Sequence, residues 1–378
     1  MSWRGNCVKI FLENSHDVRE GRKDENNMKD EYVAYVGTYT HGSSIGIHLY
    51  DVNVEEGTLT ERKVIPVNNS SHIARSLNGK YLYSIADEGV AVFAVEDDGD
   101  LTPINKVDID GMRGCYLSVD KTGRYLFVAG YHDGKVTVVH THKDGRLGSL
   151  MDGVFHKGLG SVAERNFRPH VTCTRRMPDN RFVLSVDNGI DQVKIYRFND
   201  KEQRLVQVDA IRCELESAPR HFRYSKDGKF IYLMYELKKA IDVYTYKTGD
   251  RAPVIEKIQT ISTTSTKKPD NLTAACAMRM SADQKYIYCT NAGENTISVY
   301  KRDEETGLLT MICCLPISGA YPKDVAVFPD GRHIASVNHD SGTISFFKVD
   351  YEKGLLVMSG RSIPVNEPNC CAIVKIGD

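Results

Sequence analysis

The sequence predicts an all-β protein, a seven-bladed β-propeller of four-stranded antiparallel blades. Two kinds of turn alternate along the chain, and one of them recurs seven times. The spacing of these copies fits one propeller blade, because a four-stranded blade with its turns needs about 40 to 50 residues. Both chain ends also carry a β-rich segment, which predicts that the N- and C-terminal strands close the ring.

The first kind of turn is Asp-Gly or a close variant, followed by an aromatic or apolar strand. Turns of this type need positive φ and connect tight hairpins. Six copies occur, at Asn78-Gly79, Thr122-Gly123, Asp179-Asn180, Asp227-Gly228, Asp283-Gln284 and Asp330-Gly331. The first blade has no copy of its own, and so we expect Tyr32–Val36 to pair with Ala372–Ile376 from the other end of the chain.

The second kind of turn has the form Gly-x-Leu. Its seven copies, two of them degenerate, begin at Gly57, Gly99, Gly145, Gln203, Gly249, Gly307 and Gly354. The two longest spacings predict insertions at Asp152–Arg168 and Ser262–Asn271. A four-stranded sheet cannot bury both of its faces alone, so neighbouring sheets must stack around an axis. An open array of β-sandwiches is the alternative.

Residues 1–28 differ in pattern from the rest of the chain. Their one apolar patch, Val8–Leu12, is too short for the core of a signal peptide. We therefore expect 1–28 to be a disordered leader or to precede the true start at Met28, with the propeller over 29–378. The chain also has no run of about 18 apolar residues that could span a membrane. These features predict a cytoplasmic protein without a membrane partner.

Charge and cysteine content exclude further classes of protein and of site. The 49 basic and 50 acidic side chains leave a net charge of -1, which does not suit a nucleic-acid partner. The ten cysteines include no C-x-x-C pair, so we expect buried thiols and neither a zinc site nor a disulfide framework. No Gly-rich phosphate loop and no Gly-x-Ser-x-Gly motif occurs. We expect no cofactor and no metal ion.

The alternation of turns predicts where polar chemistry gathers. Both kinds of turn above belong to one end of the ring, while the blade-to-blade crossings and the second hairpin of each blade belong to the other end. The unusual side chains fall in these crossings and second hairpins. The crossings contain His72, His170, Arg220, His221 and Lys323. The second hairpins contain His132, Asp187, Glu236, Asn291 and His339. Turn geometry accounts for many Asn and Asp residues, but it does not require His, Arg or Glu.

The spacing to the following turn gives these crossing residues a register. His72 and His221 lie six positions before the turn residue of their blade, and Arg220 and Lys323 lie seven before it. His170 lies nine positions before Asp179. Crossing segments lead into the innermost strand, so we expect these side chains to surround the opening of the central channel.

Four segments carry a resemblance to a known family. They are Gly37-Thr38-Tyr39-Thr40, Asp187-Asn188-Gly189-Ile190-Asp191, Pro219-Arg220-His221 and Glu236-Leu237. From Gly37 to the C-terminus the chain resembles the lactonase propellers, which include bacterial propeller-type 6-phosphogluconolactonases and fungal carboxymuconate cyclases. It departs from the family pattern at Arg168, where a histidine is usual, at Gly130 in place of an asparagine, and at Ala292 and Lys323, where arginines are usual.

The resemblance implies hydrolysis of a sugar lactone, with 6-phosphogluconolactone as substrate. His170 or Glu236 would serve as general base, since an imidazole or a carboxylate with a raised pKa works near neutral pH. Arg220 would stabilise the oxyanion or hold an anionic group. The implied substrate-binding side chains are Lys323 and His221, supplying positive charge, Asp187, Asn291 and His339, holding hydroxyls, and His132 and His72.

Two other functions fit the same residues. A muconate-type cycloisomerase would use the catalytic trio to move a proton and hold carboxylates, and the missing arginine at Ala292 argues against a highly anionic substrate. A non-catalytic propeller would bind a ligand or another protein. Protein-binding propellers of the WD type carry repeated Trp-Asp pairs, whereas the one tryptophan here is Trp3, outside the repeats.

Overall fold

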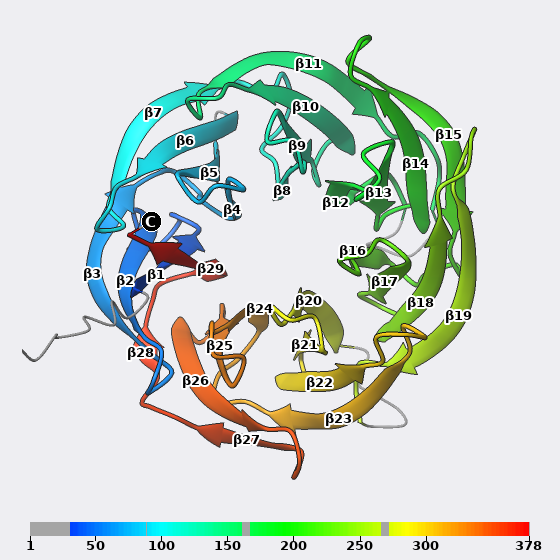
Figure 1. The fold of residues 1–378 in the computed structure, drawn as a ribbon. Coiled ribbons are helices and arrows are strands. Elements are labelled where there is room, and N and C mark those ends of the chain that lie inside the picture. Colours follow the sequence, from blue (N-terminus) through cyan, green and yellow to red (C-terminus); the bar gives the residue numbers. More distant parts are fainter. Residues whose placement is uncertain (1–30, 88, 161–166, 266–271, 378) are drawn as a thin grey trace, which may run out of the picture. The chain divides into compact units, whose positions relative to one another are not determined.

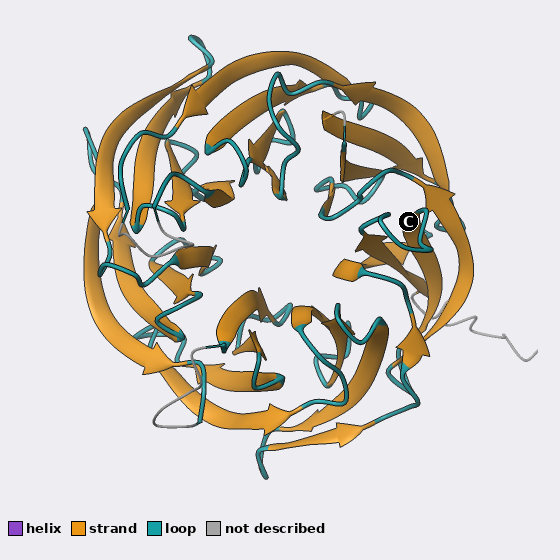
Figure 2. Ribbon diagram, turned by 180° about the vertical axis from the view of Figure 1, so that it is seen from behind, coloured by secondary structure: helices purple, strands orange, loops and turns teal. Residues whose placement is uncertain are grey.

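The computed structural model describes residues 31–87, 89–160, 167–265 and 272–377, and the regular structure in these ranges is all β. The strands form seven antiparallel sheets arranged in a ring (Figure 1). Figure 2 shows the same ring from behind, with strands and loops only. The prediction of a seven-bladed β-propeller is confirmed, and the open array of β-sandwiches is excluded.

Each blade has four consecutive strands from the inside to the outside of the ring, except that blade 1 takes its innermost strand from the C-terminus. Blade 1 contains β29 (Pro368–Ile376), β1 (Glu31–Thr38), β2 (Gly46–Asn53) and β3 (Thr58–Pro66). Blade 2 contains β4 (Ile73–Arg75), β5 (Tyr81–Ala86), β6 (Gly89–Val95) and β7 (Leu101–Val107). Blade 3 contains β8 (Tyr116–Val119), β9 (Tyr125–Ala129), β10 (Lys135–Thr141) and β11 (Leu147–Phe155).

The remaining four blades follow the same order. Blade 4 contains β12 (Val171–Arg176), β13 (Phe182–Asp187), β14 (Gln192–Asn199) and β15 (Arg204–Arg212). Blade 5 contains β16 (Pro219–Tyr224), β17 (Phe230–Tyr235), β18 (Ala240–Lys247) and β19 (Val254–Ser262). Blade 6 contains β20 (Ala274–Met280), β21 (Tyr286–Ala292), β22 (Thr296–Arg302) and β23 (Leu309–Pro316). Blade 7 contains β24 (Pro322–Val327), β25 (His333–Asn338), β26 (Thr343–Asp350) and β27 (Leu355–Met358), and β28 (Ile363–Pro364) also pairs with β26.

The two ends of the described chain meet in blade 1. Strand β29 pairs antiparallel with β1, with Tyr35 opposite Ala372 and Tyr32 opposite Lys375. In Figure 1, β29 lies on the inner side of β1. The predicted pairing of the terminal strands is therefore confirmed, and it closes the ring through backbone hydrogen bonds between segments far apart in sequence.

The recurring glycine turns adopt the backbone geometry that the sequence predicts. Gly79 and Gly145 have φ values of 74° and 80°, in the left-handed region that favours glycine. Gly145 has a second constraint, because a Cβ atom at this position would overlap the ring of Tyr81 in the preceding blade. At Gly79 the same addition meets no atom within 4 Å. The Gly-x-Leu turn therefore also provides a contact between blades.

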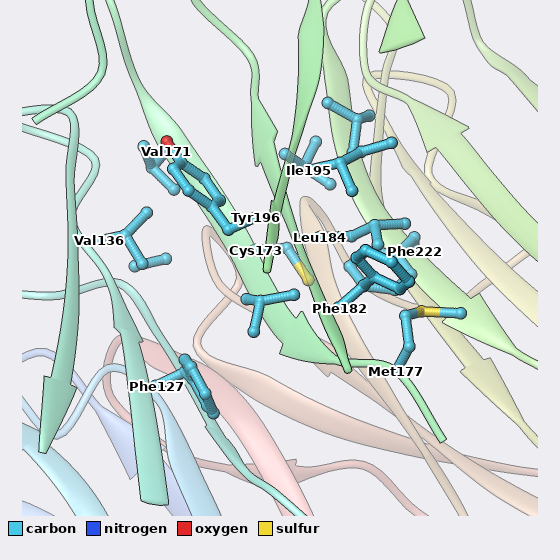
Figure 3. Packing of buried hydrophobic residues seen from close by; sticks show 14 of the residues in the cluster. Phe127, Val136, Val171, Cys173, Met177, Phe182, Leu184, Ile195, Tyr196 and Phe222 are labelled. Atoms are coloured by element: carbon cyan, nitrogen blue, oxygen red, sulfur yellow. The ribbon is translucent and has the colours of Figure 1, made fainter. Parts of the chain in front are cut away.

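Apolar side chains fill the space between neighbouring blades. In the middle of a blade both sheet faces are covered, and all six residues of β17 are buried. On the outer edge one face meets solvent, and β19 alternates between exposed and partly buried residues. Figure 3 shows the packing around blade 4, where Phe127, Val171, Cys173 and Phe222 from three blades belong to one cluster. Burial of this kind gives a large hydrophobic stabilisation.

Some predictions concern residues outside the described ranges. The predicted leader, 1–28, lies there, as do 161–166 and 266–271 in the two predicted insertions. The nine described cysteines are free thiols, six of them buried. In the described part of the chain, no helix has the length and apolar character needed to cross a membrane.

Candidate active site

A β-bulge recurs in the innermost strands, at the end of the ring that carries the blade-to-blade crossings. The pairing register shifts at this point in five blades, leaving one residue of the inner strand out of the ladder. These residues are Thr172, Arg220, Cys276, Lys323 and Asn369. A bulge re-aims the side chain of its extra residue. All five side chains line a single cavity inside the ring.

The cavity has a volume of about 320 Å³ and a mainly polar lining. Six of the ten site residues expected from the sequence line it, namely His72, His132, Arg220, His221, Glu236 and Lys323. The other four, His170, Asp187, Asn291 and His339, do not belong to this lining. The crossings and second hairpins therefore bring most of the expected residues together, as the alternation of turns predicts.

Arg220 and Glu236 form the central contact of the cavity. Arg220 is the bulge residue of β16, and Glu236 directly follows β17, the strand that pairs with β16. Nη1 of Arg220 donates to Oε2 of Glu236 at 2.5 Å, and Nε donates to the backbone carbonyl of Cys276 at 2.8 Å. The two side chains keep 25% and 12% of their surface exposed, so the ion pair is largely buried yet reachable from the cavity.

The surroundings of Arg220 favour its charged form. Burial has the largest single effect and opposes the charge of Arg220, but the Glu236 carboxylate together with Cys276 and Tyr321 outweighs burial, and the pKa of Arg220 lies above its usual value. The amide of Asn188, from blade 4, donates a second hydrogen bond to Oε2 of Glu236 at 3.1 Å. Charge-assisted hydrogen bonds of this kind hold both groups in a fixed orientation.

Lys323 adds a second cation near Arg220. Its ammonium lies 4.9 Å from the ring centroid of Tyr39 and 5.4 Å from that of Tyr321. Burial, with a smaller contribution from Arg220, lowers the pKa of Lys323 to about 8. Lys323 is therefore mostly charged at neutral pH and becomes neutral in mildly alkaline solution.

His72 and His221 both pack against Tyr116, with ring centroids 4.4 and 5.6 Å from the tyrosine ring. Burial and neighbouring arginines lower the pKa of both imidazoles well below the usual value. Both rings are consequently neutral near pH 7. This neutrality argues against the expectation that His221 supplies positive charge, although its ring lines the cavity beside Arg220.

His170 lies behind the cavity wall. Its ring stacks on Tyr131 at a centroid distance of 4.3 Å, and Tyr131 itself lines the cavity. Nδ1 of His170 lies 2.7 Å from the backbone carbonyl of Tyr131 and therefore donates a hydrogen bond to it. His132, in contrast, lines the cavity, and burial lowers its pKa below the usual value.

Asp187 and Asn291 are fully buried inside their blades. The carboxylate of Asp187 accepts hydrogen bonds from the backbone amides of His170 and Gly189 and contacts Nδ1 of His156 at 2.7 Å. The amide of Asn291 donates to the carbonyl of Thr263 at 2.7 Å. Neither side chain lines the cavity, so the structure does not support the expected contact with substrate hydroxyls. Asp187 instead fixes the backbone of its second hairpin and of the crossing before β12, and Asn291 fixes the crossing between blades 5 and 6.

His339 lies at the margin of the site. Its Nδ1 atom is 3.1 Å from the backbone carbonyl of Pro368, and its ring faces the edges of Tyr39 and Tyr321. It lines a neighbouring surface hollow and not the cavity that holds Arg220. Burial lowers its pKa below the usual value.

Several lining residues were not singled out in the sequence. They are Tyr116, Thr172, Arg223, Cys276, Arg279, Tyr321 and Asn369. Tyr39 and Tyr131 also line the cavity and had been noted only as parts of longer segments. Thr172 and Cys276 share the position of Arg220 and Lys323, seven residues before the turn of their blade. The register alone could therefore have identified them, although neither side chain suggests catalysis by itself.

The cavity as a whole favours anions. Its lining contains four cationic side chains and two carboxylates, Glu236 and Asp324. Asp324 forms a two-point ion pair with Arg279, at 2.8 and 2.5 Å. Among the described residues, no group of three or more His, Cys, Asp or Glu side chains is placed to hold a metal ion.

Comparison with known proteins agrees with this architecture. The family described as "Lactonase, 7-bladed beta-propeller" matches residues 33–373. A 6-phosphogluconolactonase of Bacillus subtilis is 30% identical over 305 residues, which cover 79% of this chain and 86% of the relative.

Solved structures extend the comparison. A candidate 6-phosphogluconolactonase of Bacteroides fragilis matches with a TM-score of 0.83 and 29% identity, covering 93% of this chain and all of the other. A periplasmic gluconolactonase of Pseudomonas aeruginosa matches with a TM-score of 0.85 and 26% identity, covering 91% and 99% of the two chains. By sequence, blade number and strand order, the chain belongs to the lactonase family of seven-bladed β-propellers.

Proposed function

We propose that the protein hydrolyses a sugar lactone, with 6-phosphogluconolactone as the substrate that fits best. The family membership and the activities named for the relatives from Bacillus subtilis and Pseudomonas aeruginosa support lactone hydrolysis. The observation that carries the proposal is the Arg220–Glu236 pair, which places a carboxylate and a fixed guanidinium side by side in a polar cavity.

The pair supplies the two groups that ester hydrolysis requires. In our proposal the lactone carbonyl lies against the guanidinium of Arg220, and a water molecule lies between the carbonyl carbon and Glu236. Glu236 removes a proton from this water as its oxygen adds to the carbonyl carbon. Arg220 stabilises the negative charge that develops on the carbonyl oxygen, a contribution of roughly 3–4 kcal/mol for one such donor in other enzymes.

The second half of the reaction restores the site. The tetrahedral intermediate collapses, the bond between the carbonyl carbon and the ring oxygen breaks, and the ring oxygen takes the proton held by Glu236. The products are a carboxylic acid and a hydroxyl group on one open chain. The acid loses its proton to solvent at neutral pH, and Glu236 is again a carboxylate.

Glu236 is the better placed of the two candidate bases. Glu236 lines the cavity, whereas His170 is separated from it by Tyr131. In this proposal His170 supports the position of Tyr131 in the cavity wall. The hydroxyls of the substrate face the tyrosines, Thr172 and Asn369 of the lining.

A phosphorylated substrate fits the charge of the cavity. The arginine that the family pattern places at Ala292 is absent, and Ala292 is buried. However, Arg220, Arg223, Arg279 and Lys323 outnumber Glu236 and Asp324 in the lining. Ala292 is therefore not a reason to exclude an anionic substrate, because other strands supply the cationic side chains of the cavity.

In our proposal the reaction needs no metal ion. Glu236 provides the base, and Arg220 provides the positive charge that a metal ion supplies in other hydrolases. Exhaustive treatment with a chelator followed by buffer exchange should leave the lactonase rate unchanged. A rate that falls and returns with added divalent cation would contradict this part of the proposal.

The test of the proposed function is the rate of lactone opening above the spontaneous rate. We expect faster hydrolysis of 6-phosphogluconolactone than of unphosphorylated gluconolactone. Incubation with a muconate and its lactone tests the alternative activity, because a cycloisomerase would interconvert those two without consuming water. If none of these compounds reacts faster than the spontaneous background, the remaining hypothesis is a non-catalytic binding protein.

We propose the cytoplasm as the location of the protein, on the basis of its many free thiols. The Pseudomonas aeruginosa relative is named as periplasmic, so an experiment has to distinguish the cytoplasm from the periplasm. Fractionation of the native host should place the full chain with cytoplasmic marker enzymes, and recovery in a periplasmic or secreted fraction would contradict this.

A further inference from the structure

Three arginines occupy the same position in three neighbouring blades. Arg175 on β12, Arg223 on β16 and Arg279 on β20 each lie four residues before the aspartate of their blade's first turn. In a repeat fold, equal positions in adjacent units lie at equal levels. We call these three residues the arginine tier.

The arginine tier lies deeper in the ring than the Arg220–Glu236 pair. Arg223 follows Arg220 by three residues on β16, which is about 10 Å along a strand. The strand runs from the crossing end towards the other end of the ring. The cavity reaches this depth, because Arg223, Arg279 and Tyr116 all line it. Arg175 is not part of this lining and is connected to the cavity through the hydroxyl of Tyr116.

The members of the tier differ in how their charge is compensated. Arg279 has a full partner in Asp324, which it contacts with two nitrogen atoms. Arg175 and Arg223 instead both donate to the hydroxyl of Tyr116, at 3.2 and 3.3 Å, and the guanidinium of Arg175 also lies 5.0 Å from the ring centroid of Tyr224. Within the described ranges, no carboxylate forms an ion pair with either of these two arginines.

Buried polar atoms at this level also lack partners. Nε of Arg175 and Nδ1 of His221 are buried and have no hydrogen-bond partner in the described part of the chain. Arg223 is only 8% exposed. Burial lowers the pKa of Arg223, and Arg175 and Arg279 add to this effect, although Tyr116 opposes it. Buried charges are costly unless they are paired, so a ligand of opposite charge would relieve this arrangement.

We propose that the arginine tier is a binding subsite for a phosphate-type dianion. Two guanidinium groups that have no carboxylate partner in the described part of the chain match the charge of a phosphate monoester, which is close to -2 at neutral pH. Guanidinium groups also bind phosphate oxygens in pairs. The site is distinct from the Arg220–Glu236 pair and lies on the inner side of it.

The identity of the phosphate carrier rests on the proposed function. If the substrate is a phosphorylated sugar lactone, its carbonyl end lies at Arg220 and its phosphate end extends inward to the tier. The tier would then fix the substrate at one end and present the carbonyl to Glu236 at the other. Free inorganic phosphate has the same chemistry and would bind the same groups.

Calorimetric titration with inorganic phosphate tests the subsite directly. We expect Arg223→Met to weaken phosphate binding at least tenfold relative to the unmodified protein. Methionine keeps most of the apolar stem and removes a buried unpaired charge, so this variant should fold, and a thermal melt checks it. Arg223→Lys, which keeps a positive charge, serves as the second variant and should lose less affinity.

The matched control is Arg124→Met. Arg124 is also an arginine near the first turn of its blade, but its side chain is 52% exposed and pairs with Asp200. Its replacement should leave phosphate binding unchanged. Equal phosphate affinity in the unmodified protein and in folded Arg223→Met, or no phosphate binding by the unmodified protein, would overturn the proposal.

A kinetic comparison separates the two sources of phosphate. If the substrate carries it, Arg223→Met should lower kcat/KM for 6-phosphogluconolactone at least tenfold more than kcat/KM for gluconolactone. If free phosphate is the ligand, the ratio of the two kcat/KM values stays constant, and added phosphate changes the rate with gluconolactone in the unmodified protein only. The titration remains decisive even if no lactone is hydrolysed, so the subsite and the proposed function fail independently.

Discussion

Nη1 of Arg220 and Oε2 of Glu236 lie 2.5 Å apart, and the contact is held by groups from three blades. Both residues belong to blade 5, where Pro219 pairs with Tyr235 and so brings the two side chains together. Blade 6 fixes Arg220 through the carbonyl of Cys276, and blade 4 contributes the amide of Asn188 to Glu236. A propeller can hold such a pair rigidly because each contributing strand is packed between two neighbouring blades.

Replacement of Arg220 should remove the stabilisation of the oxyanion. We expect Arg220→Ala to lower kcat/KM for lactone opening at least about a hundredfold, since loss of one oxyanion donor typically costs 10²–10³ in rate. Arg220→Lys should recover part of the rate, because the charge returns without the planar fork. Steady-state kinetics corrected for spontaneous hydrolysis provide the measurement.

The matched control for this variant is Arg62→Ala. Arg62 also forms an ion pair with a carboxylate, Asp51, but it lies on β3 at the outside of blade 1. Its replacement should leave the rate within error of the unmodified protein. A comparable loss in both variants would show that the effect of Arg220 is not specific to the cavity.

Replacement of His170 should have a smaller effect than loss of the catalytic base. His170 is not part of the cavity lining and stacks on Tyr131, so we expect His170→Asn to lower kcat/KM by about tenfold or less, below the 10²–10⁴ typical of a general base. The same kinetic assay measures it. A loss for His170→Asn that equals or exceeds the loss for Glu236→Gln would transfer the role of base to the histidine.

The charge of Lys323 should appear in the pH dependence. Burial and Arg220 lower the pKa of Lys323 to about 8, while Asp340 and Glu367 oppose this shift. Lys323 is charged below that pH, and so kcat/KM for a phosphorylated lactone should fall as pH rises through about 8. This decline, the alkaline limb of the pH profile, reflects the ionisation of Lys323 in the free enzyme, because kcat/KM reports ionisation of the unbound protein.

Lys323→Met provides the control for the alkaline limb. The variant should have a lower kcat/KM at pH 7 and should lack the decline near pH 8. It should also be more stable at pH 7, because Lys323 is mostly charged at this pH in both states and its burial disfavours the charged form in the folded protein. This stability gain should shrink as pH rises from about 8 towards the ordinary lysine value of about 10.4. An unchanged alkaline limb in Lys323→Met would assign it to another group.

Gly145 should tolerate alanine less well than Gly79. Both glycines have positive φ, which costs an L-residue roughly 1–2 kcal/mol. At Gly145 the new methyl group would also overlap Tyr81 of blade 2, whereas at Gly79 the space is open. We expect Gly145→Ala to lower the free energy of unfolding by about 1–3 kcal/mol more than Gly79→Ala, as overpacking does elsewhere. Equal losses in urea denaturation would contradict the proposed contact between blades.

The turns made the architecture predictable from the sequence. Each of the two turn types has a backbone requirement that few residues meet, so their positions divide the chain into blades. The pairing of Tyr32–Val36 with Ala372–Ile376 followed from the missing first-type turn at the N-terminal end, and the structure adds its register. The expectation that residues 1–28 are a disordered leader or precede the true start remains a prediction, which removal of that segment would test.

The site was predictable only where register and chemistry agreed. Arg220 and Lys323 lie at the bulge position and have side chains that suggest anion binding. His170 lies two residues before the bulge position of its own strand, which is occupied by Thr172. Its contact with the cavity therefore depends on Tyr131, a residue of another blade that no local pattern connects to it.

Asp187 and Asn291 illustrate a different limit. Asparagine and aspartate at the end of a strand can bind a ligand or fold back onto nearby backbone groups, and the sequence is the same in both cases. Here they fold back. The arginine tier illustrates a third limit, because the sequence shows three arginines in register but not that two of them share one tyrosine hydroxyl.

The most direct test of the account is the rate of 6-phosphogluconolactone hydrolysis by the unmodified protein and by Glu236→Gln, each corrected for the spontaneous reaction. Glutamine keeps the size of the side chain and can still accept the hydrogen bond from Arg220, but it cannot take a proton from water. The account predicts clear catalysis by the unmodified protein and a loss of at least about a hundredfold in the folded variant. Full activity in Glu236→Gln, with its melting temperature unchanged, would contradict it.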